Sequence, residues 1–182
     1  MKPSSKKIAL VALIALPLVL LAADEYPALR FRGDGKLSGG PVFGYWIRLR
    51  PIPFYQEGEY VFHFQGLPNE ELSFILYPDD KTDKDELELK HLETILEANL
   101  VDQHGHIICA ASGKPLKKGN NANGWVLRIR GDEVAYWHWN CVHLHMRSSE
   151  AYTLTLRIRD VDPKAPHINL LPVIEGGQPD FP

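Results

Sequence analysis

The chain has 182 residues, 45% of them apolar, a composition that suits a single globular domain with a buried core. Its formal net charge is −3. Residues 1–23 hold three lysines and no acid, so the other residues hold 17 basic and 23 acidic side chains, a net charge of −6. A mildly acidic domain without a basic block is poorly suited to the phosphate backbone, which argues against nucleic acid as a partner.

The first 23 residues predict export. MKPSSKK is a short basic segment, and IALVALIALPLVLLAA follows with 16 uncharged residues before DEYPALR begins a polar stretch. This order is typical of a signal peptide. If residues 8–23 are not cleaved, they become an N-terminal anchor in the inner membrane. In both cases the lysines stay cytoplasmic, so we expect a periplasmic or exported domain.

The cysteines support this expectation. Cys109 and Cys141 are the only two in the chain, and an even count in an oxidising compartment predicts one disulfide. The loop between them is about 32 residues long, which the chain-entropy estimate values at roughly 3–4 kcal/mol. Two free buried thiols are the alternative.

The rest of the chain divides into three parts. Residues 24–40 are glycine-rich and without periodicity, which predicts a flexible linker or, as the alternative, an entry segment that becomes ordered when it packs. We expect the folded domain over residues 41–175 and a flexible tail over residues 176–182.

Apolar residues alternate with polar ones over several short segments of the domain. Period-two alternation indicates half-buried β-strands at 42–50, 59–66, 125–131 and 151–160, and the nearly continuous apolar run at 72–78 indicates another. Asp102 and Gly105 frame a type I turn between strands at about 94–101 and 106–111. Residues 84–92 fit a short helix as well as a strand. Short strands with frequent turn signals predict an all-β fold, an antiparallel β-sandwich of Ig-like or jelly-roll-like type, with a β-barrel as the alternative.

The stretch YWHWNCVHLHM at 136–146 is the most unusual in the domain. His143 and His145 are spaced so that both rings lie on one face of a strand, a weak signal for zinc or copper, which need three or four ligands. Trp137 and Trp139 also share a face, where they either fill the core or form a platform for sugar rings. Asn140 is expected to break the strand into two segments or to mark a bulge.

Other site signals are weaker still. Asp160 and Asp162 flank Val161 at a strand end, where they suit either calcium or turn chemistry, and we favour the turn. The chain lacks a nucleophile elbow, a P-loop, a dinucleotide fingerprint and a zincin motif. We therefore expect no enzyme activity, no cofactor and no metal.

The run LEANLVDQHGHIICAASG, followed by WVLRIR and YTLTLRIRD, resembles the sheet-forming part of small exported bacterial β-sandwich proteins of uncharacterised function. Ig-like and C2-like domains contain similar strings. The resemblance implies the fold and the bacterial envelope, and it transfers no functional residue.

These expectations combine into a hypothesis about function. We expect a non-catalytic exported binding protein of the bacterial cell envelope whose partner is another envelope protein, in an inhibitor, immunity-type or accessory role. A carbohydrate-binding module using Trp137 and Trp139 is one alternative. A metal-binding envelope protein using His143 and His145 is another.

Overall fold

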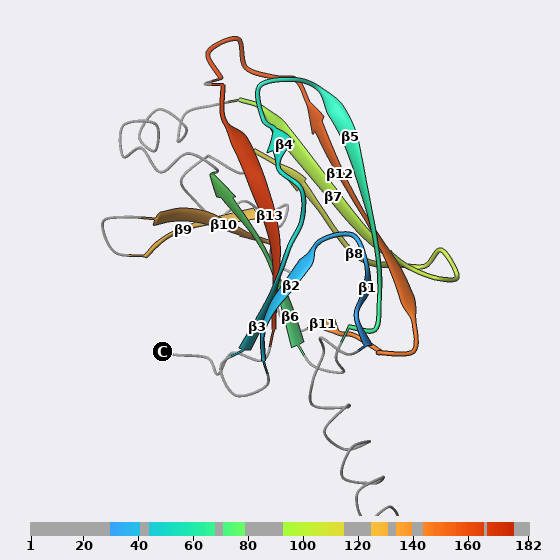
Figure 1. Ribbon diagram of the computed structural model, residues 1–182. Helices are drawn as coiled ribbons and strands as arrows, with labels where there is room; N and C mark the ends of the chain where they lie inside the picture. The colour runs from blue at the N-terminus through green and yellow to red at the C-terminus, as the bar shows by residue number, and fades with distance from the viewer. Residues whose placement is uncertain are drawn as a thin grey trace, which may run out of the picture.

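The computed structural model describes residues 30–40, 44–67, 71–78, 93–114, 125–130, 134–139, 144–165 and 167–176. In these ranges the chain is all-β and forms two antiparallel sheets that pack face to face (Figure 1). Over the same ranges the two sheets do not close on one another. The predicted β-sandwich is therefore confirmed, and the β-barrel alternative is wrong.

The first sheet has five strands, and β12 lies at its centre. In spatial order they are β1 (Arg32–Gly33), β5 (Gly58–Gln65), β12 (Ala151–Arg159), β7 (Ile95–Asp102) and β8 (Ile107–Gly113).

The second sheet is larger. Its main path in spatial order is β2 (Lys36–Gly40), β3 (Gly44–Arg48), β13 (Asn169–Gly176), β6 (Glu71–Pro78), β10 (Val134–Trp139) and β9 (Trp125–Arg130). Two short strands lie off this path: β4 (Ile52–Pro53) pairs with β13, and β11 (Leu144–His145) pairs with β6.

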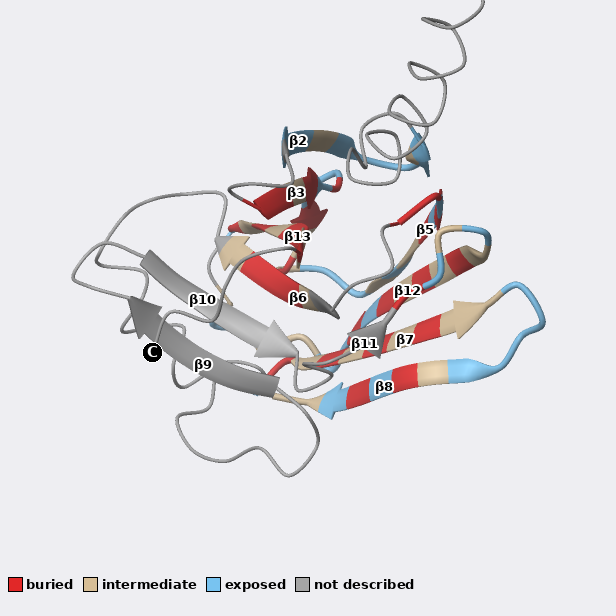
Figure 2. Ribbon diagram, turned by 90° about the horizontal axis from the view of Figure 1, so that it is seen from below, coloured by how far each residue is buried: buried red, intermediate tan, exposed pale blue. Residues whose placement is uncertain are grey.

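The alternation read from the sequence is the burial pattern of β12. Tyr152, Leu154, Leu156 and Ile158 are 1–3% exposed, whereas Arg157 and its neighbours on the other face are exposed or half-buried. On β12, β7 and β8, red bands alternate with tan or pale-blue bands in the same way (Figure 2). The inner faces of the two sheets together enclose one hydrophobic core.

The predicted hairpin is also present. β7 and β8 are joined by a turn in which the amide of Gly105 donates to the carbonyl of Asp102 at 3.1 Å. Gly105 has a φ of 83°, which a residue without a Cβ adopts at little cost. The tip is exposed and projects beyond the neighbouring strands (Figure 2).

In the described part of residues 24–40 the chain is not a flexible linker but an entry segment ordered by packing, the alternative that the sequence left open. Arg32–Gly33 forms β1 beside β5, and Lys36–Gly40 forms β2 beside β3, so one glycine-rich segment contributes an edge strand to each sheet. A Cβ on Gly33 would lie 2.1 Å from the carbonyl oxygen of His63. The glycines therefore permit a close approach of two backbones. Because the segment has almost no apolar side chains, hydrophobic periodicity could not reveal it.

Strand β13, which the alternation does not predict, lies in the middle of the second sheet and extends to Gly176, the first residue of the expected tail. Pro172 interrupts its sequence, and proline is usually confined to edges because it lacks an N–H. Here the carbonyl of Pro172 accepts from the amide of Leu49 at 2.9 Å. In an antiparallel strand the N–H and C=O of one residue point to the same side. The missing N–H thus faces the interruption between β3 and β4, where it costs little.

Candidate binding surface on the first sheet

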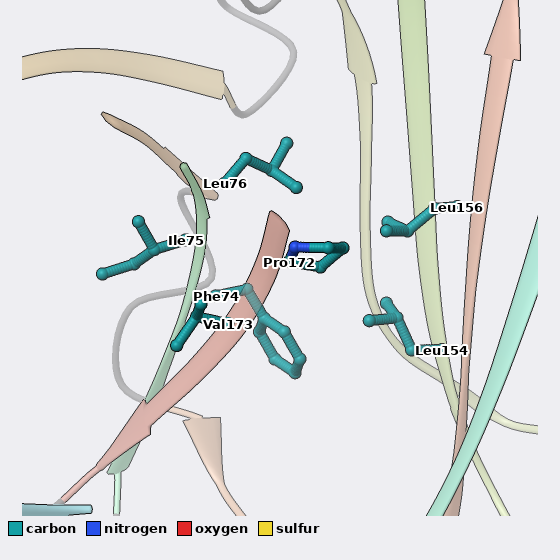
Figure 3. Close-up of a pocket in the computed structure, with 7 residues that line it drawn as sticks. All are labelled: Phe74, Ile75, Leu76, Leu154, Leu156, Pro172 and Val173. Carbon is teal, nitrogen blue, oxygen red and sulfur yellow. The ribbon is translucent and has the colours of Figure 1, made fainter. Parts of the chain in front are cut away.

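One cavity between the two sheets leaves no room for a small-molecule ligand. Phe74, Leu76 and Pro172 of the second sheet point across the sandwich toward Leu154 and Leu156 of β12 (Figure 3). The void between the sheets measures about 10 Å³ and is apolar, so it is at the lower limit for a single water molecule and is expected to be dry.

The outer face of the first sheet is divided into a charged half and a nearly uncharged half. In the charged half, Arg157 of β12 donates from Nε to Glu59 Oε2 of β5 at 2.9 Å, and its Nη1 lies 3.8 Å from Glu97 Oε2 of β7. Arg159 pairs with the same Glu97. The hydrogen bond and the charge of Glu59 hold the pKa of Arg157 above its ordinary value. Two bases and two acids neutralise one another here.

The other half carries a cluster that we call the outer patch: Val61, Val101, Ile107, Thr153 and Thr155. Register brings its members together, because Thr153 lies opposite Val101 and Val101 lies opposite Ile107. Ile107 is 65% exposed, and it is the only large hydrophobic side chain that is exposed in the described part of the chain.

The exposure of Ile107 results from a local irregularity. The pairing of β7 and β8 shifts between Leu100 and Val101, where Leu100 lies opposite Cys109 and Val101 lies opposite Ile107. Ile108 is the extra residue, and such a bulge changes which face the following residues occupy. Ile107 was not among the predicted site residues. The local sequence marks its exposure only by two consecutive isoleucines, which break the alternation of the strand.

The tip of the hairpin adjoins the outer patch and is tightly hydrogen-bonded. Asp102 Oδ1 accepts from the amides of His104 at 2.8 Å and His106 at 2.9 Å, and Asp102 Oδ2 lies 3.0 Å from His106 Nδ1. Partial burial raises the pKa of Asp102, but these hydrogen bonds and the charge of His106 outweigh it, and the net pKa is below the ordinary value. The carboxylate is thus kept ionised.

The two aspartates considered for calcium have structural contacts. Asp162 Oδ1 accepts from the amide of Lys164 at 2.8 Å, and Asp162 Oδ2 accepts from the amide of Glu93 at 3.1 Å. Asp160 has a φ of 49°, and its amide donates to Glu57 Oε1 at 3.0 Å. Both residues therefore shape the turn after β12, which agrees with the turn chemistry that the sequence favoured.

The stretch at 136–146 forms two strand segments, as expected. Trp137 of β10 lies opposite Leu76, and Leu144 of β11 lies opposite Leu72, so the chain advances seven residues while β6 advances four. Three extra residues are an odd number, and the alternation of faces is therefore reversed between the segments. The expected break at Asn140 itself lies outside the described residues.

The candidate ligands in that stretch are placed only by register. Position 137 shares the face of its partner Leu76, a core residue. Trp139 lies opposite Trp125, and His145 lies opposite Glu71. The side chains of Trp137, Trp139 and His145 lie outside the described part of the structure, as does all of His143. The sugar-platform and histidine-metal hypotheses stay predictions.

Cys109 lies on the inner face of β8, 7% exposed, and none of the described cysteines is a free thiol. Its predicted partner Cys141 lies outside the described residues, so the pairing stays a prediction. The helix-or-strand segment at 84–92 is also outside them.

The described ranges contain no group of three or more His, Cys, Asp or Glu side chains gathered as a metal site. No helix within these ranges is long and apolar enough to cross a membrane. Residues 1–23, the predicted export segment, are not among them. No protein-family model matches the chain, and no curated protein matches it either.

Proposed function

We propose that the protein is a non-catalytic binding protein of the bacterial cell envelope, exported by its N-terminal segment, and that its ligand is another envelope protein. The observation that carries this proposal is the outer patch, with Ile107 65% exposed on a sheet face. A group of apolar and uncharged side chains gathered on one exposed part of a sheet is typical of protein–protein contact.

The surroundings of the patch favour a particular kind of partner. The adjacent charged half of the face is internally paired through Glu59, Glu97, Arg157 and Arg159, so it presents little net charge. A partner with an apolar centre and an uncharged polar rim suits such a surface. The small, dry void in the core supports a surface contact over a buried small-molecule site.

A cross-linking experiment tests the proposal. A photo-activatable amino acid is placed at Ile107 in cells, and at the exposed Ser149 as a matched position in the turn before β12. We expect one envelope protein to be linked from position 107 and not from position 149. With that partner purified, Ile107→Asp should weaken binding at least tenfold, which corresponds to about 1.4 kcal/mol, whereas Ser149→Asp should not.

Two results would contradict the proposal. One is a partner whose affinity is unchanged by Ile107→Asp. The other is saturable binding of oligosaccharides that is lost when Trp137 and Trp139 are replaced by alanine, which would establish the carbohydrate-binding alternative instead.

A further inference from the structure

The tip of the β7–β8 hairpin places two imidazoles side by side. The ring centroids of His104 and His106 are 6.0 Å apart, and the ring planes are inclined at 41°. Both residues are exposed, and the His106 side chain is 77% exposed. Neither ring therefore has a packing role in the core.

The backbone beneath the rings is held by four hydrogen bonds. Asp102 Oδ1 accepts from the amides of both histidines, the amide of Asp102 donates to the carbonyl of His106 at 3.0 Å, and Gly105 closes the turn. A ligand that needs both rings would find their Cα positions already fixed, so little ordering entropy is lost on binding.

The Asp102 carboxylate also sets the tautomer of His106. An ionised carboxylate only accepts, so His106 Nδ1, at 3.0 Å, carries the proton. Nδ1 of His106 is therefore engaged by Asp102, and Nε2 is the ring nitrogen left for a metal. A carboxylate that holds the other ring nitrogen of a histidine is the usual second contact of metal-binding imidazoles.

His104 offers the same nitrogen. Its Nε2 lies 3.3 Å from the side-chain nitrogen of Gln103, which only donates, so Nε2 of His104 is the acceptor in this contact. This single exposed hydrogen bond is all that a ligand must replace at that ring nitrogen. Nε2 is thus the nitrogen that each of the two rings offers to a metal.

We propose that the hairpin tip binds a divalent copper ion through Nε2 of His104 and Nε2 of His106, with water in the remaining positions. With metal–nitrogen distances of about 2.0–2.1 Å, two imidazoles on one ion have centroids about 4.5 Å apart in cis positions and about 6.4 Å apart in trans positions. The observed 6.0 Å lies between these two values.

The number and type of ligands favour copper over zinc. Two imidazoles are fewer than the four protein ligands of a structural zinc site or the three of a catalytic one. Cu²⁺ accepts mixed nitrogen and water ligands in tetragonal geometry and binds most tightly among the divalent first-row metals. The copper site adjoins the outer patch but uses other side chains. Its test therefore needs no protein partner.

Copper titration of the purified full chain tests the inference, with calorimetry for affinity and pulsed electron spin resonance for the number of bound imidazoles. The background is the His143→Ala/His145→Ala variant, which removes the other histidine pair that the sequence suggested. We expect one Cu²⁺ carrying two imidazoles. His104→Ala and His106→Ala should each lose the two-imidazole signal and at least tenfold in affinity. His63→Ala, at an exposed histidine on the same sheet, should change neither.

A further variant distinguishes a built site from two chance histidines. Asp102→Asn should weaken copper binding about 10–100-fold, since it removes the carboxylate that orients His106. Circular dichroism and thermal melting confirm that each variant is folded. The inference is overturned if the two-imidazole signal is absent in the background variant. Its persistence in a His104→Ala/His106→Ala chain would overturn it equally.

Discussion

Replacing Leu156 by alanine is the sharpest test of the packing between the two sheets. Leu156 is 2% exposed at the centre of β12, and it borders the void that Phe74, Leu76 and Pro172 line from the other side. Alanine removes three carbon groups, and at about 0.8 kcal/mol for each the transfer contribution is about 2.4 kcal/mol.

The cavity left behind adds to this loss. If about 60 Å³ stays unfilled, a cost of about 24 cal/mol per Å³ adds about 1.4 kcal/mol. The new space adjoins the existing void. We therefore expect the neighbouring side chains to fill little of it. We therefore expect Leu156→Ala to lower the free energy of unfolding by about 4 kcal/mol, within the range of about 2–5 kcal/mol for buried leucines.

Thr155→Ala is the matched control. Thr155 is the preceding residue of β12, half-buried on the outer face between Val61 and Asn99. It should cost less than about 1 kcal/mol. If both variants unfold in urea with the same m-value, the shifts of their midpoints give the two losses in unfolding free energy. Losses of similar size would mean that both faces of β12 are buried or that the register is shifted, and the sandwich would lose its central strand.

Three further predictions concern the disulfide and two aspartates. The unreduced exported protein should show no alkylatable thiol by mass spectrometry, and two labelled cysteines would refute the Cys109–Cys141 bond. Asp162→Ala should cost about 1–3 kcal/mol in a urea melt, because two backbone amides lose their acceptor; an unchanged midpoint would contradict the structural role of this carboxylate. The pKa of Asp102 is depressed on folding, so its contribution to stability is present above the ordinary value of 3.8 and is lost as the pH falls through the lower folded value. NMR shifts of the hairpin amides should follow this titration, and Asp102→Asn should abolish it.

Local sequence patterns were sufficient where one face of a segment meets water and the other meets the core. The alternation of apolar and polar residues in β12 predicts by itself which residues face the core, because side chains of a strand between core and solvent alternate with a period of two. The hairpin was equally readable, since Asp102 and Gly105 are the residues that such a turn requires.

Segments whose side chains do not alternate depended on the tertiary structure. β2 pairs through a glycine-rich backbone, and β13 tolerates Pro172 only because the neighbouring pairing is interrupted at that point. In β6 and β13, Ile75 and Val173 point away from Leu154 and Leu156, yet both are 3% exposed (Figure 3). A strand that is buried on both faces has no alternation of apolar and polar residues, so this pattern cannot show which side faces the core.

The sequence by itself determined an all-β chain, the inner face of β12 and the turn of the hairpin, because each of these follows from residues that are near neighbours in the chain. The tertiary structure decided which exposed residues gather. Ile107 reaches the outer patch because a bulge shifts its register against Val101. Strand pairing decides such placements, and it depends on contacts between residues that local periodicity does not connect.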